Sequence, residues 1–272
     1  MNKLLHILYL GDIMGRPGRE LIAANLPALR QKYKADVVIA QSENVSHGKS
    51  MTPTHMRELQ AAGIDFFTGG NHSIERAALL PLLSDPFQPI TAPMNQPGVD
   101  PDWGIKILHT PRGEVLIMSV LGATFPEFRE PIGNPLKAID AALNAVAGQQ
   151  FIARIVNFHG DFSSEKRVIG FYLDGRVSAV IGDHWHIPTA DAMVLPGGTA
   201  HITDVGMCGT LLSSLGVSKE IIIERWRDGA KNKNDIAEGG PYQLNAVLVK
   251  IDPATALAKS ITPINMVLEK LG

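Results

Sequence analysis

The sequence predicts an α/β fold in which two β-sheets pack together and helices cover their outer sides. Its N-terminal part alternates short apolar runs with amphipathic segments, which is typical of β-α-β units and a parallel sheet. A hairpin pattern follows in the middle, and further strands return near the C-terminus, which suggests a second sheet packed on the first. We expect one domain over residues 1–272, with a small excursion at 125–150.

The N-terminal elements follow from periodicity and from helix boundary signals. Residues 4–10 are almost continuously apolar, as in a strand covered on both faces. Pro17 suits the first turn of a helix, and Gly63 suits the end of one. The expected order is a strand at 4–10, a helix from Pro17 to about Tyr33, a strand at 36–41, a helix from Thr52 to Gly63, a strand at 64–68 and a helix capped by Ser73 that reaches about Leu83.

The remaining elements are spaced less regularly. Pro126, Pro131 and Pro135 mark an irregular segment. The expected order is a hairpin of strands at 105–108 and 115–121 around Arg112-Gly113, a helix at 136–146, strands at 151–158, 177–181 and 200–203, a helix from Ser218 to Arg227, and strands at 244–251 and about 256–263.

Composition favours a soluble cytoplasmic protein. The formal charge of -2 gives no basic field, so duplex nucleic acid is not an expected partner, whereas a small nucleotide is compatible. Cys208 is the only cysteine, so the fold cannot depend on an internal disulfide. The apolar run at 4–10 is followed by no cleavage site, and no stretch approaches the roughly 20 residues of a membrane span, so no membrane association is expected.

Residues of metal-ligand type follow five of the apolar runs. Because open α/β sheets place their sites at the carboxyl ends of strands, these residues can converge. Carboxylates, amides and imidazoles together suit one or two divalent cations. The candidate ligands are Asp12, Glu43, Asn44, Asn71, His159, His184 and His186.

Each of these signals is ambiguous alone. Asp12 and the Glu43-Asn44 pair also fit polar turns or caps. Asn71-His72 follows two glycines, which allow a sharp turn close to a ligand, but an asparagine there can simply cap a helix. The spacing of His184 and His186 is the strongest local signal. The prediction of a metallohydrolase therefore rests on the combination.

Longer motifs resemble a known family. The ordered motifs are similar to those of calcineurin-like metallophosphoesterases, and the closer resemblance is to the YmdB-like branch of bacterial cyclic-nucleotide phosphodiesterases. It covers nearly the whole chain. The matching motifs are Gly11-Asp-Ile-Met-Gly-Arg-Pro-Gly-Arg19, Glu43-Asn44 with His47-Gly-Lys49, Gly70-Asn71-His72, Phe158-His159, Ser164-Glu-Lys166, Asp174-Gly-Arg-Val-Ser-Ala-Val180, His184-Trp185-His186, Thr189-Ala-Asp191 and Ile202-Thr-Asp-Val-Gly-Met207.

The resemblance implies a two-sheet β-sandwich and a binuclear centre, usually of iron or manganese, with zinc also compatible. Asp12, Glu43, Asn44 and His186 would hold one ion, and Glu43, Asn71, His159 and His184 the other, with Glu43 bridging. A metal-bridging hydroxide would attack a phosphodiester, such as a 2′,3′-cyclic nucleotide, and His72 would protonate the leaving oxygen. Relatives also suggest a homo-oligomer.

This chain departs from the branch at several positions. Gly160-Asp161, Asp183, Trp185 and His201 replace other residues, while every implied ligand is retained. Trp185 can stack on a base or simply pack, and Asp183 can orient a ligand imidazole or face solvent. Arg16, Arg19, Lys49 and Lys166 can hold phosphate or lie on solvated surfaces.

Other functions are compatible with the same residues. The protein can be a regulatory or scaffold protein that binds metal with weak or no turnover. It can also be a phosphomonoesterase on the same centre. A flavodoxin-like binding module is the alternative fold, but it gives no reason for His159, His184 and His186 to lie beside Asp12.

Overall fold

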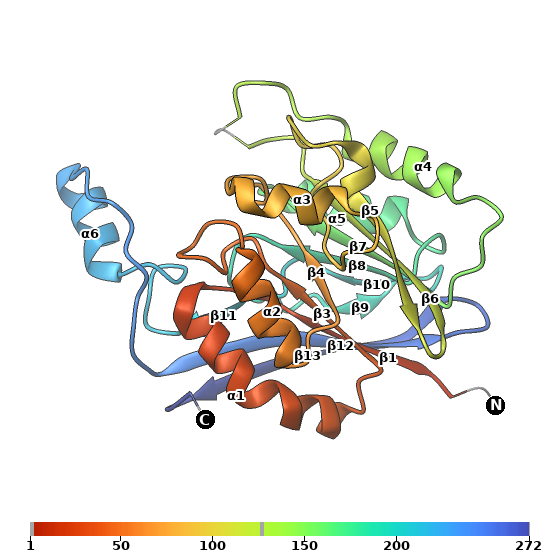
Figure 1. The fold of residues 1–272 in the computed structure, drawn as a ribbon, viewed down its shortest axis with the longest axis horizontal. Coiled ribbons are helices and arrows are strands. Elements are labelled where there is room, and N and C mark those ends of the chain that lie inside the picture. The colour runs from red at the N-terminus through yellow and green to blue at the C-terminus, as the bar shows by residue number, and fades with distance from the viewer. Residues whose placement is uncertain (1–2, 126–127, 272) are drawn as a thin grey trace.

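Two mixed β-sheets packed face to face form the centre of the protein (Figure 1). The computed structural model describes residues 3–125 and 128–271. The first sheet has the order β2 (Asp12–Ile13), β11 (Met207–Thr210), β12 (Tyr242–Asp252), β1 (Leu5–Leu10), β3 (Val37–Gln41) and β4 (Phe66–Thr68), and β13 (Leu257–Leu268) pairs with β12. The second has the order β5 (Ile105–Thr110), β6 (Gly113–Leu121), β7 (Ala153–His159), β8 (Ala179–Asp183), β10 (Ala200–Ile202) and β9 (Met193–Val194).

The predicted parallel pairing of the N-terminal strands is confirmed. β3 pairs in parallel with both β1 and β4. The predicted hairpin is also present, because β5 and β6 are antiparallel. In the second sheet, β6, β7, β8 and β10 run parallel to their neighbours in this series, so the carboxyl ends of these strands share one edge.

One topological prediction is wrong. The C-terminal strands do not build the second sheet; β12 joins the first sheet, antiparallel to β1 from Leu5↔Ile251 to Leu10↔Ala246. The second sheet comes instead from the middle of the chain. Apolar alternation identifies a strand, but it carries no information about which neighbour the strand will pair with.

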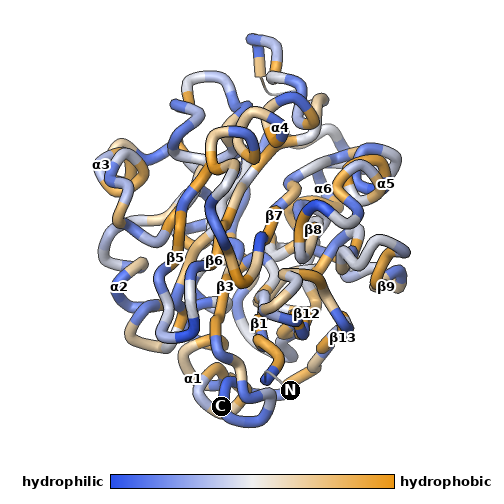
Figure 2. The backbone as a smooth tube through the Cα atoms, turned by 90° about the vertical axis from the view of Figure 1, so that its right-hand side faces the viewer, coloured by the Kyte–Doolittle hydropathy of each residue, from blue (hydrophilic) through white to orange (hydrophobic). Residues whose placement is uncertain are grey.

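Side chains of the first sheet point alternately into the core between the two sheets and into the core beneath the helices. On β1, Leu5, Ile7 and Tyr9 enter the core between the sheets, while Leu8 and Leu10 face the helices. α1 (Gly15–Tyr33) and α2 (Pro53–Ala61) cover the first sheet, and α4 (Pro135–Ala145) and α5 (Ser163–Tyr172) cover the second. Figure 2 shows the hydrophobic strands β5, β6 and β7 within these layers.

The helix that was expected to start at Ser73 begins later. Ser73 does not cap it; its hydroxyl donates to the carbonyl of Gly70 at 2.7 Å and thereby tightens the turn that carries His72. A 3-10 turn at Ala77–Leu79 leads into α3 (Leu80–Ser84), and another at Pro101–Gly104 precedes β5. The short strands β2, β9 and β11 were not predicted, since two to four residues show little periodicity.

Of two peripheral segments, one lies outside the layers and the other belongs to them. α6 (Lys219–Asp228) has no buried residue and extends from the sandwich in Figure 1. Within the expected excursion at 125–150, α4 packs against β6, and the Asn134 side chain caps α4 by accepting from the Lys137 amide. Pro126 lies outside the described residues. Among the helices of the described chain, none has the length and apolarity needed to cross a bilayer.

Candidate metal centre

The structure brings all seven candidate ligands to one edge of the sandwich. They lie at or just after the carboxyl ends of β1, β3 and β4 of the first sheet and of β7 and β8 of the second. Ligand atoms of Glu43, His159 and His184 all lie within 4.8 Å of one another. The shared edge arises because the strands concerned are parallel within each sheet, so their carboxyl ends point the same way.

One group of ligands surrounds the Asp12 carboxylate. Its Oδ2 lies 3.3 Å from His186 Nε2 and accepts from the Asn44 amide nitrogen at 3.1 Å. The second oxygen, Oδ1, is buried and has no hydrogen-bond partner within the described part of the chain. A buried carboxylate oxygen left this way has the chemistry of a cation ligand.

A second group surrounds His159. Its Nε2 lies 2.7 Å from Asn71 Oδ1 and 3.2 Å from Glu43 Oε1. The His184 ring lies beside it, with the ring centroids 4.6 Å apart and the planes at 66°. This set of one carboxylate, one amide oxygen and two imidazoles suits a borderline divalent ion.

Glu43 connects the two groups. Its Oε1 also accepts from the Asn44 amide at 3.2 Å, and its Oε2 accepts from the His72 backbone N–H at 3.0 Å. Gly70 permits this approach: a Cβ there would lie 2.3 Å from Glu43 Oε2 and 2.5 Å from a ring carbon of His159. Glu43 therefore contacts members of both groups of candidate ligands.

Outward contacts orient two of the imidazoles. His159 Nδ1 lies 2.7 Å from Asp183 Oδ1, and His186 Nδ1 donates to the Leu215 carbonyl at 2.9 Å. In both rings Nε2 consequently faces the carboxylates. A ligand histidine held through its other nitrogen is the usual arrangement in metal proteins.

The electrostatics of the three histidines differ. Burial opposes protonation of His159, but Glu43 and Asp183 outweigh it and raise its pKa to about 10. Burial is likewise outweighed at His186, where Asp12 raises the pKa to about 9. Burial and the neighbouring His159 lower the pKa of His184 to about 2. The carboxylates thus create an environment that stabilises positive charge.

His72 lies at the side of this cluster. Its Nδ1 pairs with Glu75, a residue that the sequence reasoning missed. Glu75 also binds the Lys49 ammonium at 2.9 Å. Burial would raise the pKa of Glu75, but Lys49 and His72 together lower it, so the carboxylate stays ionised beside the imidazole.

Asp183 and Trp185 both make defined contacts. Asp183 is fully buried and orients His159; Tyr9 and Gln41 donate to its other oxygen at 3.2 and 3.3 Å. Trp185 packs: its indole N–H donates to the Asp161 carbonyl at 2.8 Å, and its ring lies against Lys166.

The four basic residues considered for phosphate binding all have acidic partners. Arg16 pairs with Glu238, Arg19 with Glu58, Lys49 with Glu75 and Lys166 with Asp204. Asp204 was not singled out by the sequence reasoning, although it lies in the motif Ile202-Thr-Asp-Val-Gly-Met207. Spacing in the sequence did not reveal these pairs because most of the partners come from different elements.

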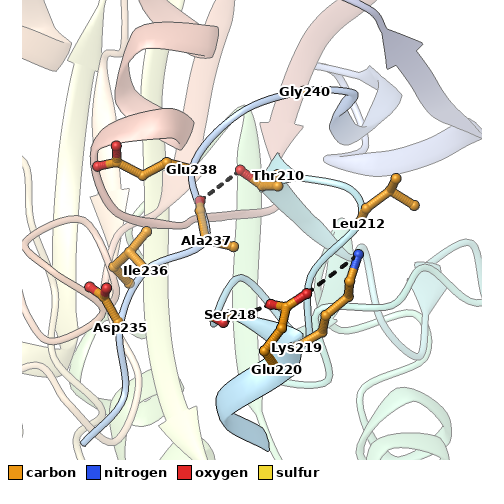
Figure 3. Close-up of a pocket in the computed structure, with 10 residues that line it drawn as sticks. All are labelled: Thr210, Leu212, Ser218, Lys219, Glu220, Asp235, Ile236, Ala237, Glu238 and Gly240. Carbon is orange, nitrogen blue, oxygen red and sulfur yellow. Dashed lines mark hydrogen bonds and ion pairs between the residues drawn. The ribbon is translucent and has the colours of Figure 1, made fainter. Parts of the chain in front are cut away.

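A large cleft lies elsewhere, beside the base of α6 (Figure 3). Its volume is about 660 Å³, and none of the candidate ligands lines it. The lining residues are Thr210, Leu212, Ser218, Lys219, Glu220, Asp235, Ile236, Ala237, Glu238 and Gly240. In Figure 3 the charged groups of Lys219 and Glu220 pair with each other at the wall of this cleft.

Comparison with known proteins gives consistent results. A sequence model described as "YmdB-like protein" matches residues 8–264. The 2′,3′-cyclic-nucleotide 2′-phosphodiesterase of Bacillus subtilis is 36% identical over 258 residues, covering 94% of this chain and 95% of the relative. A crystal structure of a phosphatase from Mycoplasma pneumoniae is 30% identical, with a TM-score of 0.90 over 98% of this chain and 95% of that one.

A more distant structure shares the fold alone. The 5′-nucleotidase of Candida albicans is 10% identical, with a TM-score of 0.55 over 97% of this chain and 51% of that one. The predicted two-sheet sandwich with outer helices is thus confirmed both by the structure and by its neighbours. The chain belongs to the YmdB-like protein family and is a phosphoesterase.

Proposed function

We propose that this phosphoesterase hydrolyses phosphodiesters at a centre of two metal ions, and that 2′,3′-cyclic nucleotides are its substrates. The substrate follows the name of the Bacillus subtilis relative. The observation that carries the metal proposal is the inward Nε2 of His159 and His186, each held through Nδ1 and each facing a buried carboxylate.

The residues fit two ions that share Glu43. Asp12, Asn44 and His186 would hold one, with the unpartnered Oδ1 of Asp12 as an available donor in the described chain. Asn71, His159 and His184 would hold the other. Iron or manganese suits these mixed oxygen and nitrogen donors, and zinc is compatible. As ligands, His159 and His186 must release the protons that the carboxylates now favour.

The chain's own residues supply positioning and proton transfer. When bound, the ions would supply Lewis-acid binding of the phosphoryl oxygens and acidify a water. His72 in its protonated form donates a proton to the leaving oxygen. Glu75 holds His72 through Nδ1, and His72 Nε2 lies 3.4 Å from the side-chain nitrogen of the candidate ligand Asn71, so this nitrogen is on the side of the ligand cluster. His159 and its partners Glu43 and Asp183 are buried, whereas His72 and His184 are partly exposed.

His72→Ala tests the role of His72. Turnover should fall by roughly 10²–10⁴-fold, which is the usual contribution of general acid catalysis. Metal content by elemental analysis and thermal stability should match the wild type, because the His72 side chain is only partly buried. His109→Ala, at an exposed histidine of β5, is the matched control. Full turnover in His72→Ala would remove this residue from the mechanism.

Substrate comparison tests the reaction class. Bis-p-nitrophenyl phosphate, p-nitrophenyl phosphate, and 2′,3′- and 3′,5′-cyclic nucleotides should be compared at equal manganese loading. We expect hydrolysis of the diesters and fastest turnover of the 2′,3′-cyclic form. Preference for the monoester would indicate a phosphomonoesterase. Metal binding without hydrolysis of any of these would indicate a regulatory or scaffold protein.

We further propose that residues 1–272 act as one domain, in the cytoplasm and as a homo-oligomer. Packing of α4 on β6 supports the first point, since it joins the segment at 125–150 to the second sheet. The free and buried Cys208 agrees with a reducing compartment. Size-exclusion chromatography with light scattering tests self-association.

A further inference from the structure

The loop that carries His184 and His186 has an unusual backbone. Both histidines have positive φ, 104° and 62°, a region that residues with a Cβ rarely adopt. Such conformations persist only when the surroundings impose them. His184 belongs to the group of candidate ligands around His159, and His186 belongs to the group around Asp12. The conformation of this loop therefore affects both groups.

A buried lysine contacts this loop from the adjacent helix. Lys166 on α5 is fully buried, and its ammonium donates to the carbonyl of Asp183, the residue immediately before the loop, at 2.6 Å. The ammonium also lies 4.2 Å from the centre of the ring of Trp185, which stands between the two histidines in the sequence.

The counter-ion of Lys166 contacts the same loop. Asp204 is also fully buried, and its Oδ2 accepts from Lys166 Nζ at 2.7 Å and from the Trp185 backbone N–H at 2.8 Å. Its Oδ1 accepts from the Gly206 N–H at 2.9 Å. The pair thus fixes a carbonyl before His184 and an amide after it.

We propose that Lys166 is a positioning residue for the metal centre: paired with Asp204, it holds the His184-Trp185-His186 backbone in the conformation that directs both imidazoles to the site. It acts through the loop and contacts no candidate ligand side chain among its described bonds. The link to metal affinity rests on the proposed function; the link to loop conformation does not.

The test uses Lys166→Met, which keeps the length of the side chain and removes its charge. Lys106→Met is the matched control, because Lys106 is also buried and donates to two backbone carbonyls, those of Leu83 and Asp85, away from the ligands. Two quantities are measured on metal-free protein: hydrogen exchange of the amides at 183–187, and the dissociation constant for Co²⁺ from its visible absorption.

In Lys166→Met these amides should exchange with solvent faster. The variant should also bind Co²⁺ about 10–100-fold more weakly, which is the usual effect of removing a residue that supports a metal ligand. Lys106→Met should lower thermal stability without either effect. Wild-type exchange and wild-type affinity in Lys166→Met would overturn the proposal. Absence of Co²⁺ binding by the wild type would contradict the proposed metal centre. Faster amide exchange in Lys166→Met would then still support the role of Lys166 in holding the loop.

Unfolding of Lys166→Met would reflect the buried Asp204 charge left without its partner. The double variant K166M/D204N removes both charges and decides that case. The amide oxygen introduced by D204N can still accept from the Trp185 backbone N–H, whereas the bond from the Gly206 N–H is lost; without a buried unpaired charge the fold should be retained. Weaker Co²⁺ binding by the folded double variant supports the proposal, and unchanged binding contradicts it.

Discussion

Two buried histidines of the second sheet have opposite electrostatic environments. His159 ends β7 and His201 lies within β10, and their exposed fractions are 0% and 1%. Equal burial would favour the neutral imidazole in both. Instead, the pKa of His159 is raised to about 10, whereas burial lowers that of His201 to about 4 against the attraction of Asp191.

The difference comes from position along the strand. At the carboxyl end of β7, Glu43 from the turn after β3 and Asp183 from the end of β8 lie 3.2 and 2.7 Å from the two ring nitrogens of His159. His201 points from the middle of β10 toward α5, where its ring meets Gly170. Burial alone therefore does not identify a site; convergence of carboxylates at a sheet edge does.

Glu43→Gln should have the largest effect, because it removes the charge shared by both ligand groups. We expect metal affinity to fall by more than ~100-fold, beyond the roughly 10–100-fold typical of outer partners, with turnover lost in parallel. Metal content by elemental analysis checks this. Gln60→Glu, on α2, is the control, because it exchanges the same two residue types in the opposite direction at a position outside the centre. Retention of two ions by Glu43→Gln would refute the bridging role.

Asp183→Asn should have an intermediate effect, since it removes the carboxylate that orients His159. Affinity for the ion on the His159 side should drop roughly 10–100-fold, measured by Co²⁺ titration. Asp36→Asn is the control for loss of a carboxylate elsewhere: Asp36 accepts from the His6 backbone N–H and pairs with Arg112, and it lies at the opposite end of β3 from Glu43. Equal losses in the two variants would show that Asp183 contributes only stability.

His201 should give the smallest effect, on stability alone. Its pKa is about 4 in the folded protein and about 6.5 when unfolded, so the unfolded state binds more protons below pH 6.5. The free energy of unfolding therefore keeps its full value above pH 6.5, and it decreases by roughly 3 kcal/mol at most as the pH falls toward 4. In urea unfolding experiments over this pH range, the free energy of unfolding should decrease less for His201→Leu than for the wild type, by up to the same amount. His109→Leu, at an exposed histidine of β5, is the control variant.

Much of the secondary structure was predictable, and the pairing of strands was not. β1, β3 and β4 lie where their apolar runs predicted, because the runs are too short for helices and are bounded by turn or helix-start signals. The placement of β12 beside β1 was missed, since strands pair through backbone N–H and C=O groups that are the same in every strand. Likewise, Glu75 follows His72 closely in sequence, but only the turn tightened by Ser73 brings the two side chains together.

The sequence by itself determined the fold class, the family resemblance and the types of ligand available, because these depend on local periodicity and on motifs read along the chain. Tertiary structure decided which residues meet: Asp183 with His159, and Lys166 with Asp204 around the histidine loop. These pairs join different elements. Their contacts depend on sheet order and on low-dielectric burial, neither of which is encoded in the spacing of neighbouring residues.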